Sequence, residues 1–346
     1  MSKKISVLAA SNSSRRIFLA AALSAAAALP LAGTAHAAEP VLLNVSYDVM
    51  REVFKDINPA FIADYKKKTG ATVTVNQSHG GSSKQARSVA DGLEASVVTM
   101  NQANDVDLLA DRGLVAADWK AKFPHNAAPF YSTVVYLVRK GNPKQIKDWA
   151  DLAKPDVKVV IPNPKTSGNG RYTYLAAWGA VLNKGGSEAQ ARELVGKIFK
   201  NVPVMDTGGR AATTTFTQRQ IGDVLVTFEN EVQLVRTEFG DNFEVVYPAV
   251  SILAESPVAV VDKVVDKRGL RKEATAYLNF LYSDAGQEIL AKHYLRPTSD
   301  AVAKKYASTF QPITLLSVDK VFGGWRAAQK KHFDDGGEFD KIYATK

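Results

Sequence analysis

The sequence predicts an α/β fold with largely parallel strands, organised as two domains. Short apolar runs alternate with longer amphipathic runs, which is the pattern of strands alternating with helices. One junction, an apolar strand followed by a glycine- or serine-rich loop and a helix, occurs three times. The length of 346 residues exceeds that of a typical single domain and fits two.

Residues 1–37 are predicted to be a signal peptide that is cleaved from the mature protein. Residues 1–38 contain no Asp or Glu, and basic residues precede an apolar run from Ile17 to Leu31. That run is shorter than the about 20 residues of a membrane-spanning helix. A cleavage site of A-x-A form follows at residues 35–37. The segment 14–19, with Arg15 and Arg16, is similar to a twin-arginine export signal, and an ordinary secretory signal is the alternative.

The positive charge belongs in large part to this leader. The whole chain has a formal net charge of +9, and residues 1–37 hold four of its cations and none of its acids. The mature chain therefore keeps 40 Lys and Arg against 35 Asp and Glu, a net charge of +5. Its one dense basic cluster, residues 66–68, is assigned to a solvated helix end. Because aromatic residues are not interleaved with basic ones, nucleic-acid binding is not expected.

In the first half of the mature chain, the expected elements begin with a strand and an amphipathic helix. The helix follows from the four-residue spacing of Val49, Val53, Ile57, Phe61 and Tyr65. Asn58-Pro59 is expected to kink or restart it, and Gly70 to end it. The expected strands are 42–46, 73–75 and 97–100, and the expected helices after the first are 84–93 and 104–112.

In the second half, strands again alternate with helices until about Lys272, after which the chain is mainly helical. The expected strands are 131–139, 157–161, 202–205, 224–228, 243–247 and 258–261. Helices are expected over 170–182 and from about Arg210.

The three junctions, at residues 77–83, 165–170 and 206–210, indicate an anion site. Ligands of open α/β sheets bind outside the carboxyl ends of the strands. A helix that begins there offers unpaired N–H groups and a partial positive charge. Glycines let the backbone approach an anion closely, and serines add hydroxyl donors. Any one junction is also explained by turn chemistry alone, but three together predict convergence on one small anion.

Several other kinds of site are excluded or disfavoured. The absence of cysteine excludes disulfides, a thiol nucleophile, an iron–sulfur cluster, cysteine-ligated zinc and a cysteine-linked lipid anchor. There is no phosphate-loop motif for nucleotides and no G-x-S-x-G elbow. The histidines are too scattered for a metal site, and no cofactor is expected. His79 near Ser82 and Ser83 makes a poor catalytic triad because no third member is evident.

Six segments, spread in order over the mature chain, carry a family resemblance. They are Ser46-Tyr47-Asp48, residues 77–85 (QSHGGSSKQ), 138–143 (VRKGNP), 162–168 (PNPKTSG), 252–255 (ILAE) and 321–325 (VFGGW). In these segments the chain resembles periplasmic sulfate- and thiosulfate-binding proteins, the soluble substrate-capturing subunits of ATP-driven ABC importers. The resemblance implies a binding protein rather than an enzyme, located in the periplasm. Its implied partners are the permease subunits and the ATPase, and the expected state is a monomer.

The resemblance also implies an α/β, two-lobed periplasmic binding protein fold of type II, with the ligand in the cleft. The first lobe is expected at residues 41–135 plus 255–346, and the second at 136–254. The crossings between the lobes are expected near residues 131–139 and 251–257.

By position, the resemblance assigns the anion to neutral donors with no side-chain cation. Asp48 and Ser82 are expected to donate backbone N–H groups from the first lobe. From the second, Ser167 is expected to donate its hydroxyl, and Gly168, Asn169 and Gly209 their backbone N–H groups. The Asp48 carboxylate is expected to point away from the anion and cap its own helix. Arg210 is expected either to pair with a carboxylate and hold the lobes closed or to be a surface residue.

Two positions favour the thiosulfate-binding subgroup. The family's indole donor falls on Phe228, which has no polar hydrogen, and Asn169 replaces a glycine usual in strict sulfate binders. A phenyl ring suits the larger, softer sulfur atom of thiosulfate better than a donor does. The sequence therefore favours thiosulfate, with sulfate also accepted. The alternatives are a binder of another oxyanion, such as molybdate or phosphate, and a periplasmic serine hydrolase that uses Ser82 or Ser167.

Overall fold

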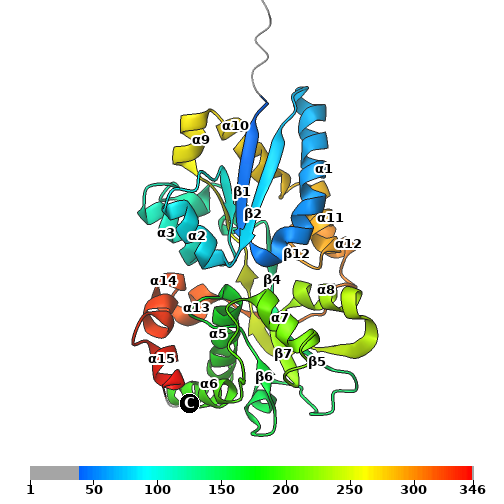
Figure 1. Ribbon diagram of the computed structural model, residues 1–346, viewed down its shortest axis with the longest axis vertical. Helices are drawn as coiled ribbons and strands as arrows, with labels where there is room; N and C mark the ends of the chain where they lie inside the picture. The colour runs from blue at the N-terminus through cyan, green and yellow to red at the C-terminus, as the bar shows by residue number, and fades with distance from the viewer. Residues whose placement is uncertain (1–38, 345–346) are drawn as a thin grey trace, which may run out of the picture. The chain divides into compact units, whose positions relative to one another are not determined.

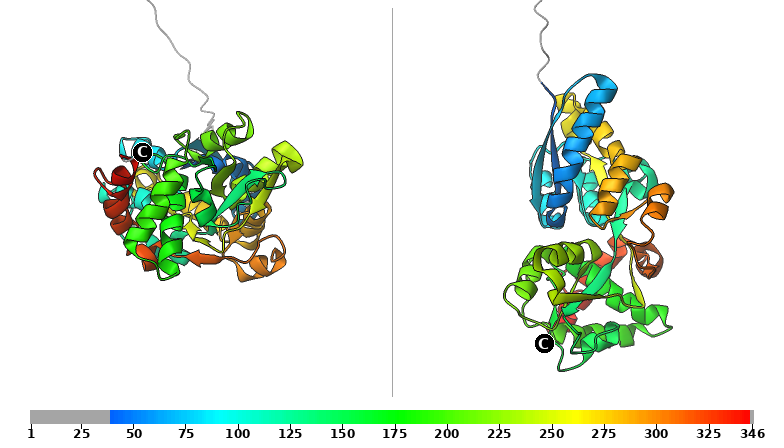
Figure 2. Two further views of the ribbon diagram at one scale, coloured as in Figure 1. Left: turned by 90° about the horizontal axis from the view of Figure 1, so that it is seen from below. Right: turned by 90° about the vertical axis from the view of Figure 1, so that its right-hand side faces the viewer.

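The computed structural model describes residues 39–344, so the expected signal peptide at residues 1–37 lies outside the described residues. The described residues form two lobes, each with a four-stranded sheet and surrounding helices (Figures 1 and 2). No helix in this range is both long and apolar enough to cross a membrane. The two-lobed α/β architecture is the one that the sequence predicts.

The sheet of the first lobe has the strand order β11-β3-β1-β2. Its strands are β1 (Val41–Tyr47), β2 (Thr74–Gly80), β3 (Val97–Thr99) and β11 (Val258–Val260). Strands β1, β2 and β3 are parallel, and β11 is antiparallel to β3. Ser46 pairs with His79 of β2 and with Thr99 of β3, so the carboxyl ends of these three strands meet at one edge.

The helices of the first lobe follow its strands. They are η1 (Asp48–Met50), α1 (Arg51–Thr69), α2 (Ser82–Ala90), α3 (Ala103–Asp111), α9 (Asp262–Arg268), α10 (Arg271–Phe280) and α11 (Asp284–Lys292). Gly70 ends α1 in the left-handed region at φ +75°, as expected. Of the kink or restart expected at Pro59, the restart is wrong: α1 continues through this residue, because Ile57 and Phe61 on either side are held in the first core.

The sheet of the second lobe has the order β6-β7-β5-β8 and is mixed rather than largely parallel. Its strands are β5 (Val134–Arg139), β6 (Val159–Val160), β7 (Val224–Phe228) and β8 (Phe243–Val246). Strand β5 is antiparallel to both β7 and β8, because the chain enters this lobe through β5 and runs away from the first lobe. The main helices here are α5 (Gly168–Asn183), α6 (Glu188–Lys200), α7 (Gly209–Thr217) and α8 (Glu229–Phe239).

Two sequence-based assignments near the junctions differ from the structure. Residues 202–205 form no strand, since Pro203 cannot donate a ladder hydrogen bond. The segment expected as a loop at 77–83 is strand as far as Gly80, because β2 pairs with β1 along its whole length. Helix α2 therefore begins at Ser82, with only Gly81 between strand and helix.

Short strands connect the lobes. Strands β4 (Phe130–Ser132), β10 (Ala254–Glu255) and β12 (Arg296–Pro297) form one small sheet, and β9 (Val250–Ile252) pairs in parallel with β13 (Thr314–Leu316). The chain passes between the lobes from β4 to β5, from β9 to β11 and from β12 to β13. The first two passages lie at residues 130–139 and 250–260, and the third was not among the expected crossings.

The C-terminal residues pack on the second lobe, which differs from the expected assignment of 255–346 to the first. The second core includes Trp325, Phe333 and Phe339, and Trp325 packs edge-on against Tyr172 at a ring distance of 4.9 Å. These aromatic side chains hold the chain end against α5. The remaining elements are η2 (Trp119–Ala121), α4 (Pro124–Ala127), η3 (Trp149–Ala153), η4 (Gly240–Asn242), α12 (Asp300–Lys305), α13 (Val318–Phe322), α14 (Trp325–Ala328), η5 (Gln329–Phe333) and α15 (Glu338–Tyr343).

Candidate functional site

One small pocket between the lobes is lined by all seven residues that the sequence nominates for ligand binding. They are Asp48, Ser82, Ser167, Gly168, Asn169, Gly209 and Phe228. The cavity volume is about 10 Å³, close to the space of a single water-sized sphere. A large metabolite does not fit such a space.

Helical segments from both lobes begin at this pocket. Asp48, Ser82, Gly168 and Gly209 are the first residues of η1, α2, α5 and α7, and Phe228 is the residue before α8. First-turn N–H groups have no partner within their own helix, and the helix dipole makes each such end partly positive. In Figure 1, α2 lies at the bottom of the upper lobe, and α5 and α7 lie at the top of the lower lobe, where the two lobes face each other. The pocket is therefore surrounded by oriented donors.

The hydroxyl of Ser82 is already engaged within the first lobe. It donates to Asp105 Oδ2 at 2.6 Å and accepts from the Asn101 backbone N–H at 3.1 Å. Ser83 donates to the other oxygen of Asp105 at 2.8 Å. Asp105 thus fixes both serines at the start of α2, and it is the backbone N–H of Ser82, rather than its side chain, that remains for a ligand.

The Asp48 carboxylate contacts its own helical turn, but it does not cap that turn, which differs from the expectation. Its Oδ1 accepts from the Val49 backbone N–H at 3.0 Å, although Tyr47 rather than Asp48 is the residue before η1. Burial raises the pKa of Asp48, and the nearby Arg210 guanidinium opposes that rise.

Ser167 precedes α5, and its hydroxyl oxygen accepts from the Gly170 backbone N–H at 3.4 Å. The two glycines after it have close neighbours, a movable side chain at Gly168 and fixed backbone at Gly170. A β-carbon on Gly168 would overlap the side-chain amide of Asn101 in the first lobe, and one on Gly170 would overlap the carbonyl oxygen of Pro162. The start of α5 can therefore approach the first lobe more closely than any residue with a β-carbon allows.

Asn169 uses its side chain for packing inside the second lobe. Its Nδ2 donates to Thr227 Oγ1 at 2.9 Å, and a β-carbon on Gly209 would lie 3.3 Å from this same nitrogen. Phe228 is buried and packs edge-on against Tyr172 at a ring distance of 5.8 Å. The second lobe thus presents backbone N–H groups together with an apolar ring.

None of the described residues that line the pocket is Lys, Arg or His. Two nearby arginines, Arg171 and Arg210, have partners in both lobes. Arg171 of α5 donates to the Pro164 carbonyl at 2.9 Å and to Ser83 Oγ of the first lobe at 3.3 Å. Arg210 of α7 lies 3.3 Å from Glu52 of α1 in the first lobe. The sequence left open whether Arg210 pairs with a carboxylate or is a surface residue, and the structure shows the pairing.

The structure also places a buried acid behind this ion pair. Glu231 is 1% exposed, lies 3.4 Å from Arg210 and accepts from the Thr213 hydroxyl at 3.3 Å. Burial raises the pKa of Glu231 to about 7, and Asp48 adds to the rise while Arg210 opposes it.

Comparison with known proteins shows the family to which the chain belongs. Residues 42–296 match the family model of bacterial extracellular solute-binding proteins. A thiosulfate-binding protein of Pseudomonas aeruginosa is 61% identical over 332 residues, which are 95% of this chain and 99% of that protein. A sulfate-binding protein of Escherichia coli is 53% identical over 315 residues, which are 90% of this chain and 96% of that protein. The chain is a member of the sulfate- and thiosulfate-binding protein family.

Solved structures support the same fold. The sulfate-binding protein SubI of Mycobacterium tuberculosis matches with a TM-score of 0.78 and 32% identity, covering 86% of this chain and all of that one. A periplasmic thiamin-binding protein matches with a TM-score of 0.63 at 17% identity, covering 88% of this chain and 96% of that one, which shows the fold alone. The fold is therefore the two-lobed fold of periplasmic binding proteins.

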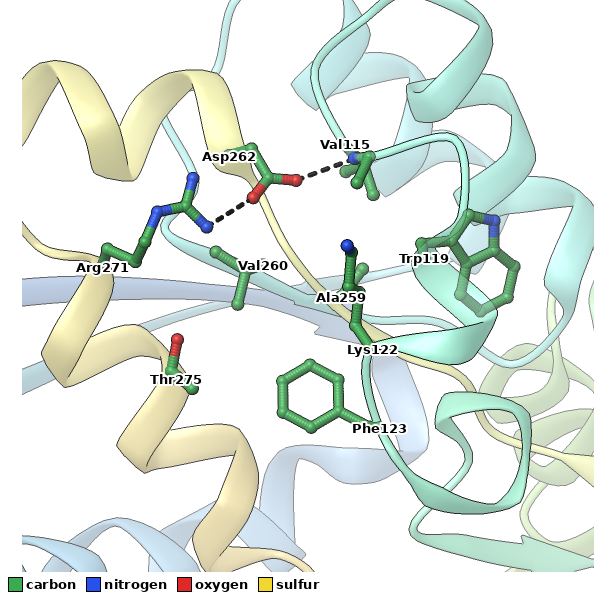
Figure 3. Close-up of a pocket in the computed structure, with 10 residues that line it drawn as sticks. Val115, Trp119, Lys122, Phe123, Ala259, Val260, Asp262, Arg271 and Thr275 are labelled. Atoms are coloured by element: carbon green, nitrogen blue, oxygen red, sulfur yellow. Dashed lines mark hydrogen bonds and ion pairs between the residues drawn. The ribbon is translucent and has the colours of Figure 1, made fainter.

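A larger pocket in this family member, of about 270 Å³, lies elsewhere in the first lobe (Figure 3). Trp119, Phe123 and Val260 line it beside Asp262 and Arg271. Its charged groups are paired with each other: Asp262 accepts from the Ala116 backbone N–H and from Arg271, each at 2.7 Å. Because none of the seven nominated residues lines it and its acid is already paired with Arg271, it is a weaker candidate.

Sequence reasoning missed part of the binding pocket. Tyr47, Val49, Gly81, Asn101 and Gly208 also line it. Four of these are neighbours of nominated residues, and the junction pattern could have included them. Asn101 is different, because it follows β3, a strand end without a glycine- or serine-rich loop. The rule that ligands bind beyond the carboxyl ends of strands could have found it.

Proposed function

We propose that this chain is the periplasmic binding subunit of an ABC importer, that it captures thiosulfate, and that it also accepts sulfate. The observation that carries the proposal is the pocket itself, in which helix starts from both lobes surround a space without any cationic side chain. Charge-assisted hydrogen bonds from fixed N–H groups are strong in a dry site, so they stabilise a dianion without a counter-ion. The relatives named for thiosulfate and sulfate support this ligand class.

A site made of donors discriminates between oxyanions by their protons. Thiosulfate and sulfate are fully deprotonated at neutral pH, so each oxygen accepts hydrogen bonds. Phosphate retains a proton there, and its O–H needs an acceptor. The side-chain acceptors lining the pocket include Asp48, whose Oδ1 already accepts from Val49, and Asn101, whose amide can turn its Nδ2 to a ligand instead of its oxygen. Phosphate is therefore expected to bind poorly.

Phe228 is the basis for preferring thiosulfate. It is 4% exposed and lines the pocket from the end of β7, yet its ring offers no polar hydrogen. One oxygen of sulfate facing this ring would lose a hydrogen bond, whereas the soft sulfur of thiosulfate loses little. The ring accordingly favours thiosulfate, in which a sulfur atom replaces one of the four oxygens of sulfate.

A serine hydrolase is the alternative that the contacts oppose. Ser82 gives its hydroxyl proton to Asp105 at 2.6 Å, and His79 Nδ1 contacts Ser46 Oγ at 2.8 Å instead of Ser82. A serine–histidine hydrolase needs the histidine within hydrogen-bond reach of the nucleophilic serine, and here the histidine contacts a different serine. We therefore propose capture and release of an unchanged anion by a monomer that delivers it to the permease subunits and their ATPase.

The test is calorimetric titration of the ligand-free mature protein, residues 38–346, with thiosulfate, sulfate, phosphate and molybdate. We expect tight binding of thiosulfate, binding of sulfate and little heat with phosphate. Tight phosphate binding without any response to thiosulfate or sulfate would contradict the donor-only site. Molybdate binding tighter than both sulfur oxyanions would assign the protein to another oxyanion.

A further inference from the structure

Asn101 is a pocket residue that no motif of the sequence nominates. It lies just beyond β3 in the first lobe, is 7% exposed and lines the same small pocket as Ser82 and Gly168. Its backbone N–H donates to Ser82 Oγ at 3.1 Å, which fixes its position beside the start of α2. Its side-chain oxygen Oδ1 is buried and has no hydrogen-bond partner.

The side chain of Asn101 also reaches across to the second lobe. A β-carbon added to Gly168 would overlap both the oxygen and the nitrogen of the Asn101 amide. The amide therefore lies flat against the first residue of α5, at the point where the two lobes meet around the pocket. A polar group in this position is desolvated when the cleft closes.

An unpartnered buried carbonyl oxygen is unfavourable, and a ligand that only accepts hydrogen bonds cannot relieve it. An asparagine amide carries an acceptor on one side and two donors on the other, and rotation about its terminal torsion exchanges them. Beside a dianion, the orientation with Nδ2 toward the ligand is the favourable one. The residue type thus suits an anion site in a way that an aspartate would not.

We propose that Asn101 is a further ligand-contacting residue, whose side-chain amide donates a hydrogen bond from the first lobe to the bound tetrahedral dianion. The inference rests on the proposed function. It gives the first lobe a side-chain donor, in addition to the backbone N–H groups of Asp48 and Ser82. It also makes one residue responsible both for ligand contact and for the close fit against Gly168.

The test compares Asn101→Ala with Asn104→Ala in calorimetric titrations of the full mature protein with thiosulfate and with sulfate. Asn104 is the matched control: its Oδ1 is also buried without a partner, and its Nδ2 donates to Gln329 Oε1 of the C-terminal segment at 3.3 Å, but the residue does not line the pocket. It therefore controls for the loss of a contact between the lobes without the loss of a ligand contact. We expect Asn101→Ala to bind both anions about 10- to 100-fold more weakly, the usual range for a hydrogen bond to a charged group. Asn104→Ala is expected to bind within about twofold of the original protein.

A second readout separates ligand contact from packing. Because the Asn101 oxygen has no partner, its removal is expected to leave the melting temperature of the ligand-free protein unchanged or higher. In the proton–nitrogen correlation spectrum, the side-chain amide signal that is lost in Asn101→Ala is expected to shift downfield when thiosulfate is added.

The outcomes are distinguishable. Affinity of Asn101→Ala within twofold of the original overturns the inference, as does an amide signal that stays in place with saturating thiosulfate. Weaker binding that is matched by a lower melting temperature of the ligand-free variant also overturns it, since the residue then acts through packing. Failure of the unaltered protein to bind any of the sulfur oxyanions overturns the proposed function itself.

Discussion

Arg210 of the second lobe and Glu52 of the first form an ion pair across the cleft, with 3.3 Å between Nη2 and Oε2. The same guanidinium lies 3.4 Å from the buried Glu231 of its own lobe. One arginine thus joins α7, α1 and α8 beside the pocket. Because Glu52 and Arg210 are about one-third exposed, at 33% and 36%, water weakens their attraction, and the pair is expected to tune closure rather than to determine it.

Replacement of Arg210 by Gln is predicted to weaken thiosulfate binding moderately. An exposed ion pair contributes up to about 1 kcal/mol, which corresponds to a loss of roughly fivefold, and the effect should appear mainly in the dissociation rate. The matched control is Lys267→Gln, which removes an exposed pair with Glu94 within the first lobe. Stopped-flow kinetics would show equal dissociation rates for the two variants if the pair across the cleft had no role in closure.

Glu231 is predicted to make stability depend on pH. Because its pKa is raised to about 7 in the folded protein, above the ordinary glutamate value of 4.5, the folded state binds more protons than the unfolded state between these pH values. Its contribution therefore disfavours folding increasingly as pH rises from about 4.5 through 7. Glu231→Gln removes this pH dependence. The unfolding free energy of the variant minus that of the original should therefore be larger at pH 8 than at pH 5, by about 1 kcal/mol or more.

Urea unfolding at the two pH values measures this difference directly. Groups that titrate in both proteins contribute equally to both and cancel in the comparison. His332 is one of them, and burial lowers its pKa to about 4. An identical stability difference at pH 5 and pH 8 would show that Glu231 keeps an ordinary pKa.

Gly168→Ala is predicted to weaken ligand binding at least tenfold without destabilising the ligand-free protein. The added β-carbon overlaps Asn101 only where the lobes meet, so it opposes closure rather than folding. In an Asn101→Ala background the same change should cost less affinity, because the overlapping amide is gone. A double-mutant cycle measures this coupling, and strictly additive effects would mean that the two residues do not touch in the bound state.

Asp105→Ala is predicted to lower both stability and affinity. Asp105 is 4% exposed and accepts from Ser82, Ser83 and Gln102, so its removal takes the carboxylate acceptor from two buried hydroxyls, while Gln102 keeps its hydrogen bond to Ser83 Oγ at 3.1 Å. We expect a loss of about 1–3 kcal/mol of unfolding free energy. Asp111→Ala, on the exposed end of the same helix α3, is the control and should change stability by less than about 0.5 kcal/mol. Equal unfolding midpoints for the two variants would contradict this role.

Phe228→Trp is predicted to shift the preference from thiosulfate toward sulfate, because the indole N–H adds a donor that an oxygen uses better than sulfur does. Phe239→Trp, in the same lobe but outside the pocket, is the control and should leave the affinity ratio unchanged. The ratio of the two dissociation constants, measured by competitive titration, decides the point. A ratio in Phe228→Trp equal to that of the original would remove the argument for thiosulfate.

The sequence predicted the site better than the lobe boundaries, for physical reasons. Gly168 and Gly209 could be nominated because a strand end, a small residue and a helix start are all local features. All seven nominated residues line one pocket, although their contact with an anion stays a prediction. Asn101 was missed because its role depends on the neighbouring lobe, and no local pattern records such a contact.

The assignment of the chain end shows the same limit. Trp325 and Phe339 are apolar in any context, and only the presence of Tyr172 and Phe199 on the second lobe decides where they pack. The direction of β5 was likewise hidden, because an apolar strand looks the same whether its neighbours are parallel or antiparallel. Helix α1 continued through Pro59 because tertiary packing outweighed the local preference for a break.

The central claim is that neutral donors of both lobes hold a dianion in this pocket. A crystal structure of the mature protein grown with thiosulfate tests it most directly. The account predicts the anion within hydrogen-bond distance of the backbone nitrogens of Ser82, Gly168, Asn169 and Gly209, with no lysine or arginine nitrogen in contact. Thiosulfate bound by a cationic side chain, or seated instead in the pocket of Trp119 and Phe123, would contradict it.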